Sequence, residues 1–185
     1  MGGVVSIRSL EPDDILEEGK NKTFEISSSY NGQNLSYQPS IKFAFRDNDV
    51  AGIVAGSIGR SKELQRNTDK IYQSDIDNEN QSYYLKLIKS VGKTDYDLVL
   101  ENIDKDTTSR ATAYINSKEG ASSGKDVGEN SRFRASLGFK YNSDEDKLID
   151  ELSGKVYINN LKHKNNYEQE FPANPQRNTP AATNN

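Results

Sequence analysis

The sequence contains no cysteine and no tryptophan, and it has one methionine and one histidine. Without cysteine, the chain cannot form disulfide bridges, Cys-ligated zinc sites, iron–sulfur clusters or thiol nucleophiles. With His163 as the only histidine, neither a Ser-His-Asp triad elsewhere in the chain nor a multi-histidine metal site can form. These absences argue against most enzyme classes. We predict a protein that is not an enzyme and that has no catalytic, cofactor-binding or metal-ligating residues.

Long apolar runs are also missing from the sequence. No stretch of about 18 consecutive apolar residues occurs, so no membrane span is predicted. The first ten residues contain no basic region followed by a long apolar stretch, and they predict no signal peptide.

The composition is low in apolar residues for a chain of one-domain length. The 185 residues are 32% hydrophobic, and adding the 13 glycines gives roughly 39%, against about 45–50% in ordinary globular chains. This deficit predicts a thin core, an unfolded part of the chain, or a partner that supplies apolar surface. The 24 basic and 28 acidic residues give a net charge of −4. Such a charge attracts no nucleic acid, and direct nucleic-acid contact is not expected.

Alternation with a period of two residues is the dominant pattern. It is clearest over residues 132–141, where apolar side chains occupy the odd positions and mostly polar ones the even positions. Because side chains on a strand point alternately to opposite faces, this pattern predicts an antiparallel strand with one dry and one wet face. The predicted dry face consists of Phe133, Ala135, Leu137, Phe139 and Tyr141.

Residues 83–101 predict a β-hairpin. Two alternating runs are separated by the polar stretch Lys89–Asp95, which contains a glycine and indicates a longer hairpin loop. Tyrosine suits strand positions because its ring can be buried while its hydroxyl stays in water. The hairpin side chains either build a protein interface and its supporting core or are ordinary core residues. The candidate interface residues are Tyr83, Leu85, Leu87, Tyr96, Leu98 and Leu100.

Weaker strand patterns occur elsewhere, and helix is scarce. Alternation predicts further strands over Thr23–Tyr30, Leu35–Phe45, Val50–Ile58, Arg110–Ile115 and Lys155–Leu161. Short helices are predicted over Pro12–Glu18 and Ser143–Leu152, where proline or serine marks the start.

The predicted fold is a single antiparallel β-barrel or sandwich with one short helix near residues 144–152 and a disordered C-terminal tail. The β domain covers residues 1–162, and the tail covers residues 163–185, which are rich in Asn, Gln, Pro and Thr. The stretch Glu119–Asn130 consists mainly of glycine, serine and charged residues, and it is also predicted to be mobile.

Three motifs have both a functional and a structural interpretation. Gly52–Gly59 is glycine-rich but lacks the Gly-Lys-Ser/Thr ending of a phosphate loop, so strand glycines explain it better. Asp75, Asp77 and Glu79 resemble half of a calcium loop without its central glycine and terminal glutamate, and they indicate an exposed acidic loop. A basic stripe of Arg132, Arg134 and Lys140 could contact phosphates, and its default interpretation is solvated strand charge.

The hairpin carries a family resemblance. The segments Tyr84–Ile88 and Asp97–Ile103 resemble the hairpin of the ELL-associated factor (EAF) family, in which an apolar strand, a short turn and an aromatic-Leu-Glu strand follow one another. Upstream, Phe24–Tyr30 and Tyr37–Ile41 are similar to a split form of that family's aromatic-Lys-Pro-x-Ser-Ile segment. Tyr72 occupies the place of the aromatic residue before the hairpin.

The resemblance covers about residues 20–115 and departs from the family pattern at several points. An insertion separates Tyr30 from Pro39, Gln38 replaces the family's lysine, and Gln73 replaces its glycine. The resemblance implies a β-barrel that forms a heterodimer with an ELL-type partner in the nucleus and supports transcription elongation.

The function predicted from the sequence is therefore a non-catalytic protein–protein interaction subunit, with an EAF-like elongation cofactor as the specific form. Two other classes fit the same composition. One is a self-assembling structural β protein of a virion, tail or cell surface. The other is a β-barrel that binds a carbohydrate or another small ligand in its mouth.

Overall fold

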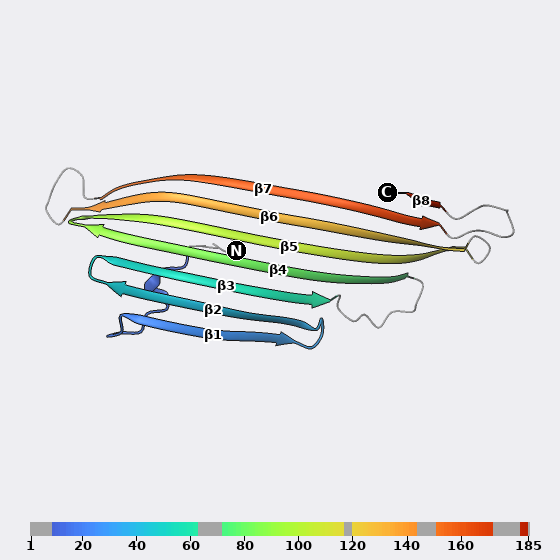
Figure 1. Ribbon diagram of the computed structural model, residues 1–185, viewed down its shortest axis with the longest axis horizontal. Helices are drawn as coiled ribbons and strands as arrows, with labels where there is room; N and C mark the ends of the chain where they lie inside the picture. The colour runs from blue at the N-terminus through green and yellow to red at the C-terminus, as the bar shows by residue number, and fades with distance from the viewer. Residues whose placement is uncertain (1–8, 63–71, 117–119, 144–150, 172–181, 185) are drawn as a thin grey trace, which may run out of the picture.

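The computed structural model describes residues 9–62, 72–116, 120–143, 151–171 and 182–184. They form one antiparallel sheet of eight strands, which lie side by side in the order in which they occur in the chain (Figure 1). A single turn of 3₁₀ helix, η1 (Pro12–Asp14), precedes the sheet. The strands are β1 (Lys22–Asn31), β2 (Ser36–Asp47), β3 (Val50–Lys62), β4 (Tyr72–Val91), β5 (Thr94–Asn116), β6 (Gly120–Asn142), β7 (Glu151–Phe171) and β8 (Ala182–Asn184).

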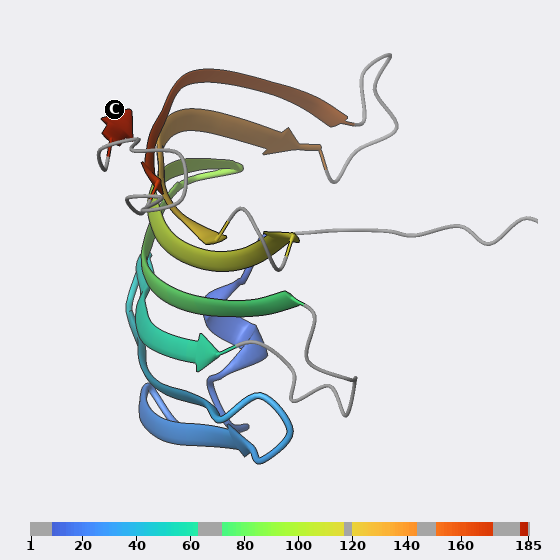
Figure 2. The same cartoon turned by 90° about the vertical axis from the view of Figure 1, so that its right-hand side faces the viewer.

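The prediction of a mainly β, antiparallel fold is confirmed. The sheet is curved but open, since β1 and β8 are its two edges and do not pair with each other (Figure 2). The described part of the chain forms one sheet layer, which is not closed into a barrel.

The predicted hairpin is present, but its strands are much longer and its loop is shorter than the alternation suggested. Leu85 pairs with Leu100 and Leu87 with Leu98, and the pairing continues to Val91 and Thr94. A two-residue connection suffices because Gly92 adopts the left-handed conformation, with φ +61°, which glycine reaches without steric cost.

Two segments that were predicted to be mobile lie partly in strands, and residues 172–181 and 185 of the predicted tail lie outside the described residues. The stretch Glu119–Asn130 belongs to β6 from Gly120 onward, and β7 continues past the predicted domain boundary at residue 162 as far as Phe171. These polar stretches pair with each other, for example Val127 with Asn166. Ladder hydrogen bonds are made by the backbone, so a polar segment can join a sheet when its neighbour is already in place.

The two predicted helices have different outcomes. Pro12–Glu18 forms only the one turn of η1, which ends at Asp14. Of the helix predicted over Ser143–Leu152, residues 144–150 lie outside the described residues, and its last two residues begin β7.

The curved sheet has a concave and a convex face of opposite chemical character. Residues paired across antiparallel strands lie on the same face, so the register assigns every strand residue to one face or the other. The N-terminal segment, residues 9–21, lies inside the curve with η1 (Figure 2). The small buried core lies where this segment covers the concave face, and it consists of Pro12, Ala44, Ala51, Ile53 and Val99.

The alternation predicts the strand correctly, but the face that it predicts to be buried is the exposed one. The apolar residues of β6, predicted to lie on a dry face, are on the open convex face, where Leu137 is 61% exposed. On the concave side the neighbouring Ser136 is buried. The accessible surface of the chain is 14146 Å², whereas a compact monomer of this mass exposes about 9,000 Å². The sheet thus leaves a large apolar surface uncovered.

Close packing on the convex face gives one testable consequence at Gly52. A Cβ at this position would lie 2.6 Å from Phe45 and 2.8 Å from Leu87, so we expect Gly52→Ala to destabilise the fold by about 1 kcal/mol through overpacking. The control is Gly32→Ala, because a Cβ there would meet only Tyr30, at 3.8 Å. Thermal unfolding of both variants tests this, and equal melting temperatures would contradict it.

Candidate functional site: an apolar convex face and a polar concave face

An apolar band crosses the convex face of all seven long strands. Its members come from successive strands that are paired in register, as in the row Phe24, Phe43, Val54, Leu85, Leu100, Ala135 and Ile158. Many of these side chains are exposed, with Ile158 at 71% and Val156 at 74%. Exposed apolar patches larger than a few hundred Å² are rare on soluble monomers and mark a surface that something else covers.

The band has the same length on three of the strands, whereas on β4 the charged Lys89 lies at the level of Val50 and Tyr96. On the convex face, the stretches Tyr37–Phe45 of β2, Val50–Ile58 of β3 and Phe133–Tyr141 of β6 contain no charged side chain. Nine residues of strand are about 30 Å long at about 3.3 Å per residue. For strands tilted by about 35–45°, this corresponds to a height of about 21–25 Å.

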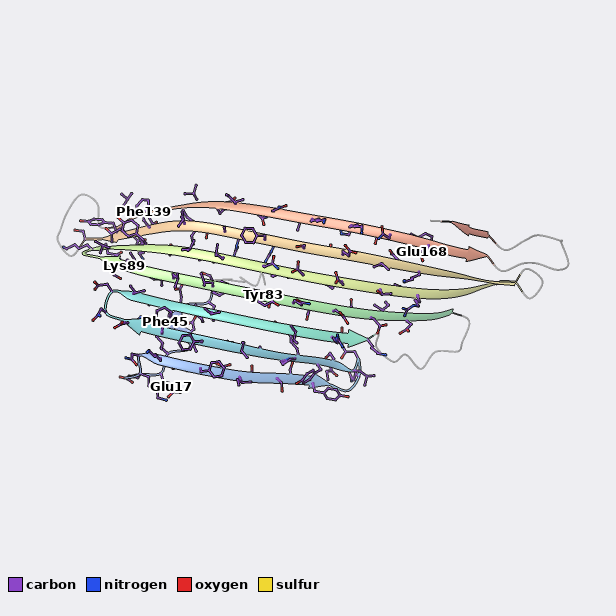
Figure 3. All side chains as sticks on the ribbon, viewed as in Figure 1. Glu17, Phe45, Tyr83, Lys89, Phe139 and Glu168 are labelled. Carbon is purple, nitrogen blue, oxygen red and sulfur yellow. The ribbon has the colours of Figure 1, made fainter. Side chains whose placement is uncertain are left out.

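Aromatic side chains lie in the central row of the band, at Phe24 and Phe43, and also towards its two borders. Tyr30, Tyr37 and Tyr83 lie towards one border, and Tyr83 is labelled in Figure 3. Tyr96 and Phe139, which are paired across β5 and β6, lie towards the other border. Rings with an apolar body and a polar tip suit a boundary between an apolar and an aqueous phase.

The convex face becomes charged where the strands continue past the band. Arg60 forms an ion pair with Glu79 at 3.2 Å, and Lys164 with Glu129 at 3.7 Å. These pairs are largely exposed, so each contributes little to stability. These ion pairs lie where the convex face changes from apolar to charged.

All six predicted interface residues lie on the convex face, on the adjacent strands β4 and β5. Tyr83 and Tyr96 are 54% and 52% exposed, and the four leucines between them are half-buried. A hollow of about 600 Å³ lies beside them and is lined by Leu87, Tyr96 and Leu98, with Leu137, Phe139 and Val156 from β6 and β7.

The concave face is lined by polar side chains that bond to one another across the strands. Ser27 and Ser40 hydroxyls are 2.7 Å apart, and Ser57 and Ser82 hydroxyls are 2.8 Å apart. Lys42 donates to Glu25 at 2.9 Å. Such cross-strand pairs satisfy polar groups on a surface that is partly shielded from solvent.

The strongest charge cluster on this face is centred on Glu101. Its two carboxylate oxygens accept from Arg132 and Arg134, the latter at 2.6 Å. The Glu101 side chain is 12% exposed, whereas those of Arg132 and Arg134 are 43% and 40% exposed. A cavity of about 700 Å³ opens beside the cluster and is also lined by Tyr84, Lys155, Tyr157 and Asn159.

Polar contacts hold the N-terminal segment against the concave face. Lys86 on β4 forms an ion pair with Glu11, and the Lys86 side chain is only 8% exposed. The Tyr84 hydroxyl donates to the Leu10 carbonyl at 2.9 Å, and Arg46 pairs with Asp13 at 2.5 Å. The segment therefore occupies part of the space enclosed by the curved sheet.

The structure places the three remaining sequence motifs within strands. Gly52–Gly59 lies within β3, as the strand interpretation predicted. Asp75, Asp77 and Glu79 do not form a loop but lie within β4, where Arg110 approaches Asp75 at 3.9 Å and Asp77 at 3.7 Å. Of the basic stripe, Arg132 and Arg134 join the Glu101 cluster, while Lys140 pairs with Glu151 at 3.3 Å.

Lys86, Glu101 and Tyr84 are not among the residues predicted from the sequence to form a site. A signal for them existed, because each occupies the strand face opposite the leucines of its own strand. The pattern alone assigned that face to solvent, and only the curvature of the sheet and the position of the N-terminal segment make it an enclosed surface.

In comparisons with known proteins, no family model and no curated protein matches the chain. Among the described residues, no group of three or more Asp, Glu, Cys or His side chains is arranged to hold a metal ion.

In the part of the chain that the structure describes, no helix is long and apolar enough to cross a membrane.

Proposed function

We propose that this chain forms part of the wall of a membrane-embedded β-sheet. In this proposal the convex face contacts lipid hydrocarbon. The concave face borders a polar interior that admits polar solutes. The single observation that carries the proposal is the inverted polarity of the fold. Most of the exposed large apolar side chains lie on the convex face, away from the small core found among the described residues, whereas the polar side chains of Lys86 and Ser136 are buried on the concave face.

The dimensions of the apolar band support hydrocarbon as its covering. Strands that cross a bilayer need about 9–11 residues when tilted, and they show an apolar outer band about 25 Å tall between aromatic girdles. The stretches of β2, β3 and β6 whose convex side chains carry no charge have nine residues each, and tyrosines lie towards the borders. The ion pairs beyond the band, such as Arg60 with Glu79, would then lie outside the hydrocarbon.

The proposal also accounts for the open edges of the sheet. Unpaired backbone N–H and C=O groups cost several kcal/mol each in hydrocarbon, so a sheet embedded in lipid must close on itself. The outer edge of β1, and that of β7 beyond its short pairing with β8, would therefore pair with further strands of the same wall. In water the same long edges would invite aggregation.

A single-tryptophan experiment tests the proposal directly, because the chain has no tryptophan of its own. Ile158 lies on the convex face and its neighbour Asn159 on the concave face, and both are exposed. In vesicles of brominated phosphatidylcholine, we expect the I158W fluorescence to be quenched about twofold or more relative to that of N159W, with emission at shorter wavelength. Equal quenching of the two reporters, or failure of the chain to enter vesicles, would overturn the proposal.

The second candidate function is a protein interaction subunit of the EAF-like type, in which a partner chain covers the same face. The observation that favours it is an apolar hollow of about 600 Å³ that is lined by three of the six predicted interface residues, Leu87, Tyr96 and Leu98. In that case the I158W emission would shift when the partner is added and would not respond to vesicles. Affinity purification from the native source would then recover a defined partner.

A further inference from the structure

We propose that the concave face carries a binding site for small organic anions with a carboxylate or phosphate group. The site is formed by Arg132, Arg134 and Lys155 in the cavity beside Glu101. It goes beyond the wall proposal and does not depend on it, because the site lies on the face opposite the apolar band.

The two arginines have more donors than Glu101 can use. Each guanidinium has five N–H donors, and each donates one terminal N–H group to a carboxylate oxygen of Glu101. The Nε atoms of Arg132 and Arg134 are buried and have no hydrogen-bond partner among the described residues. Leaving a buried donor unpaired is unfavourable, so a rearrangement that lets the guanidiniums donate to a second oxyanion is favourable.

The charge balance of the cavity favours an anion. Its lining contains three cations, Arg132, Arg134 and Lys155, and one carboxylate, Glu101, which leaves a net charge of +2. Asp97 approaches Lys155 at 3.2 Å and lowers the local sum to +1. The chain as a whole has a net charge of −4, so the sign of the charge is reversed here. Planar guanidinium groups bind carboxylate and phosphate oxygens in a bidentate manner.

The shape of the cavity indicates a solute with an apolar part. A volume of about 700 Å³ lies within the range of small-molecule sites, about 300–1,000 Å³. Tyr84, Tyr157 and Val99 supply apolar surface next to the arginines, and Asn159 adds an amide. Leu10 of the N-terminal segment borders the same space, so the ligand would lie between the sheet and this segment.

Titration of the full chain with benzoate and with inorganic phosphate tests the site. The readout is the shift of the arginine Nε–Hε NMR signals, together with calorimetry. We expect saturable binding in the millimolar range, tighter for benzoate because of its ring. Arg134→Gln should weaken binding about tenfold or more, which corresponds to at least one fork of charge-assisted hydrogen bonds. The matched control is Arg60→Gln, an arginine paired with a glutamate on the convex face, which should bind as the unchanged chain does.

Since Arg134→Gln alone leaves Glu101 with one partner fewer, the double variant E101Q/R134Q removes opposite charges together and preserves the fold. It should bind benzoate as weakly as Arg134→Gln does. Absence of saturable shifts at Arg132 and Arg134, an equal loss of binding in Arg60→Gln, or unchanged affinity in the folded double variant would each overturn the proposal. If the I158W reporter fails while the titration succeeds, only the wall proposal is lost.

Discussion

Replacement of Leu137 by arginine is expected to destabilise the lipid-embedded protein by about 2–4 kcal/mol, the cost of a cation on a lipid-facing strand near the bilayer midplane. Leu137 lies in the middle of the β6 stretch whose convex side chains carry no charge, and it is 61% exposed on that face. In water the same substitution would be nearly neutral, because an exposed arginine stays hydrated. Urea unfolding of the chain refolded into phosphatidylcholine vesicles measures the difference.

The matched control for this prediction is Leu152→Arg, at the border of the band. Leu152 is 51% exposed and pairs with Tyr141 at the end of β6. Near the membrane–water boundary the cost of arginine falls to about 0–1 kcal/mol. Equal destabilisation by the two substitutions, or none by either, would argue against hydrocarbon as the covering of the convex face. If a protein partner covers this face, Leu137→Arg would instead weaken binding of that partner.

Replacement of Glu11 by glutamine is expected to release the N-terminal segment from the concave face. The Lys86 ammonium would remain buried without its carboxylate, and removing one member of a buried pair costs about 3–5 kcal/mol. Because Glu11 is 33% exposed, we expect a smaller effect of about 2 kcal/mol after solvent screening. Hydrogen exchange at Ile15 and Leu16, whose amides bond to the Pro12 carbonyl, should accelerate about 30-fold.

Two further variants separate loss of the ion pair from loss of charge. Glu25→Gln removes the partner of Lys42 in a more exposed pair and should cost less than about 1 kcal/mol. The double variant E11Q/K86M removes both charges and should recover part of the protection, since no buried charge is left unpaired. If Glu11→Gln leaves exchange of the two amides unchanged, the ion pair does not hold the segment in place.

The strands that could be predicted from the sequence are those whose own side chains alternate. Phe133 to Tyr141 and the hairpin of Leu85 and Leu100 are of this kind, and all of them lie in the sheet. The extensions of β6 and β7 were missed because Val127 and Asn166 pair through backbone groups, which leave no pattern in the side chains. The two-residue turn at Gly92 was not predicted because the residues around it, Lys89–Asp95, are mostly polar. In the structure most of them belong to the ends of β4 and β5.

The cluster of Glu101, Arg132 and Arg134 could not be predicted from the sequence. Its residues are about 30 positions apart, and the register of β5 against β6 brings them together. Register is set by long-range pairing and by turn lengths rather than by local composition.

By itself, the sequence determined that this chain forms antiparallel strands with one apolar and one polar face, and that it has too few apolar residues to enclose a full core. Both properties follow from the two-residue periodicity of a strand and from composition. Only the tertiary structure decided which face points inward. The direction in which the sheet curves, and the attachment of the N-terminal segment through Glu11 and Lys86, depend on contacts between residues far apart in the chain.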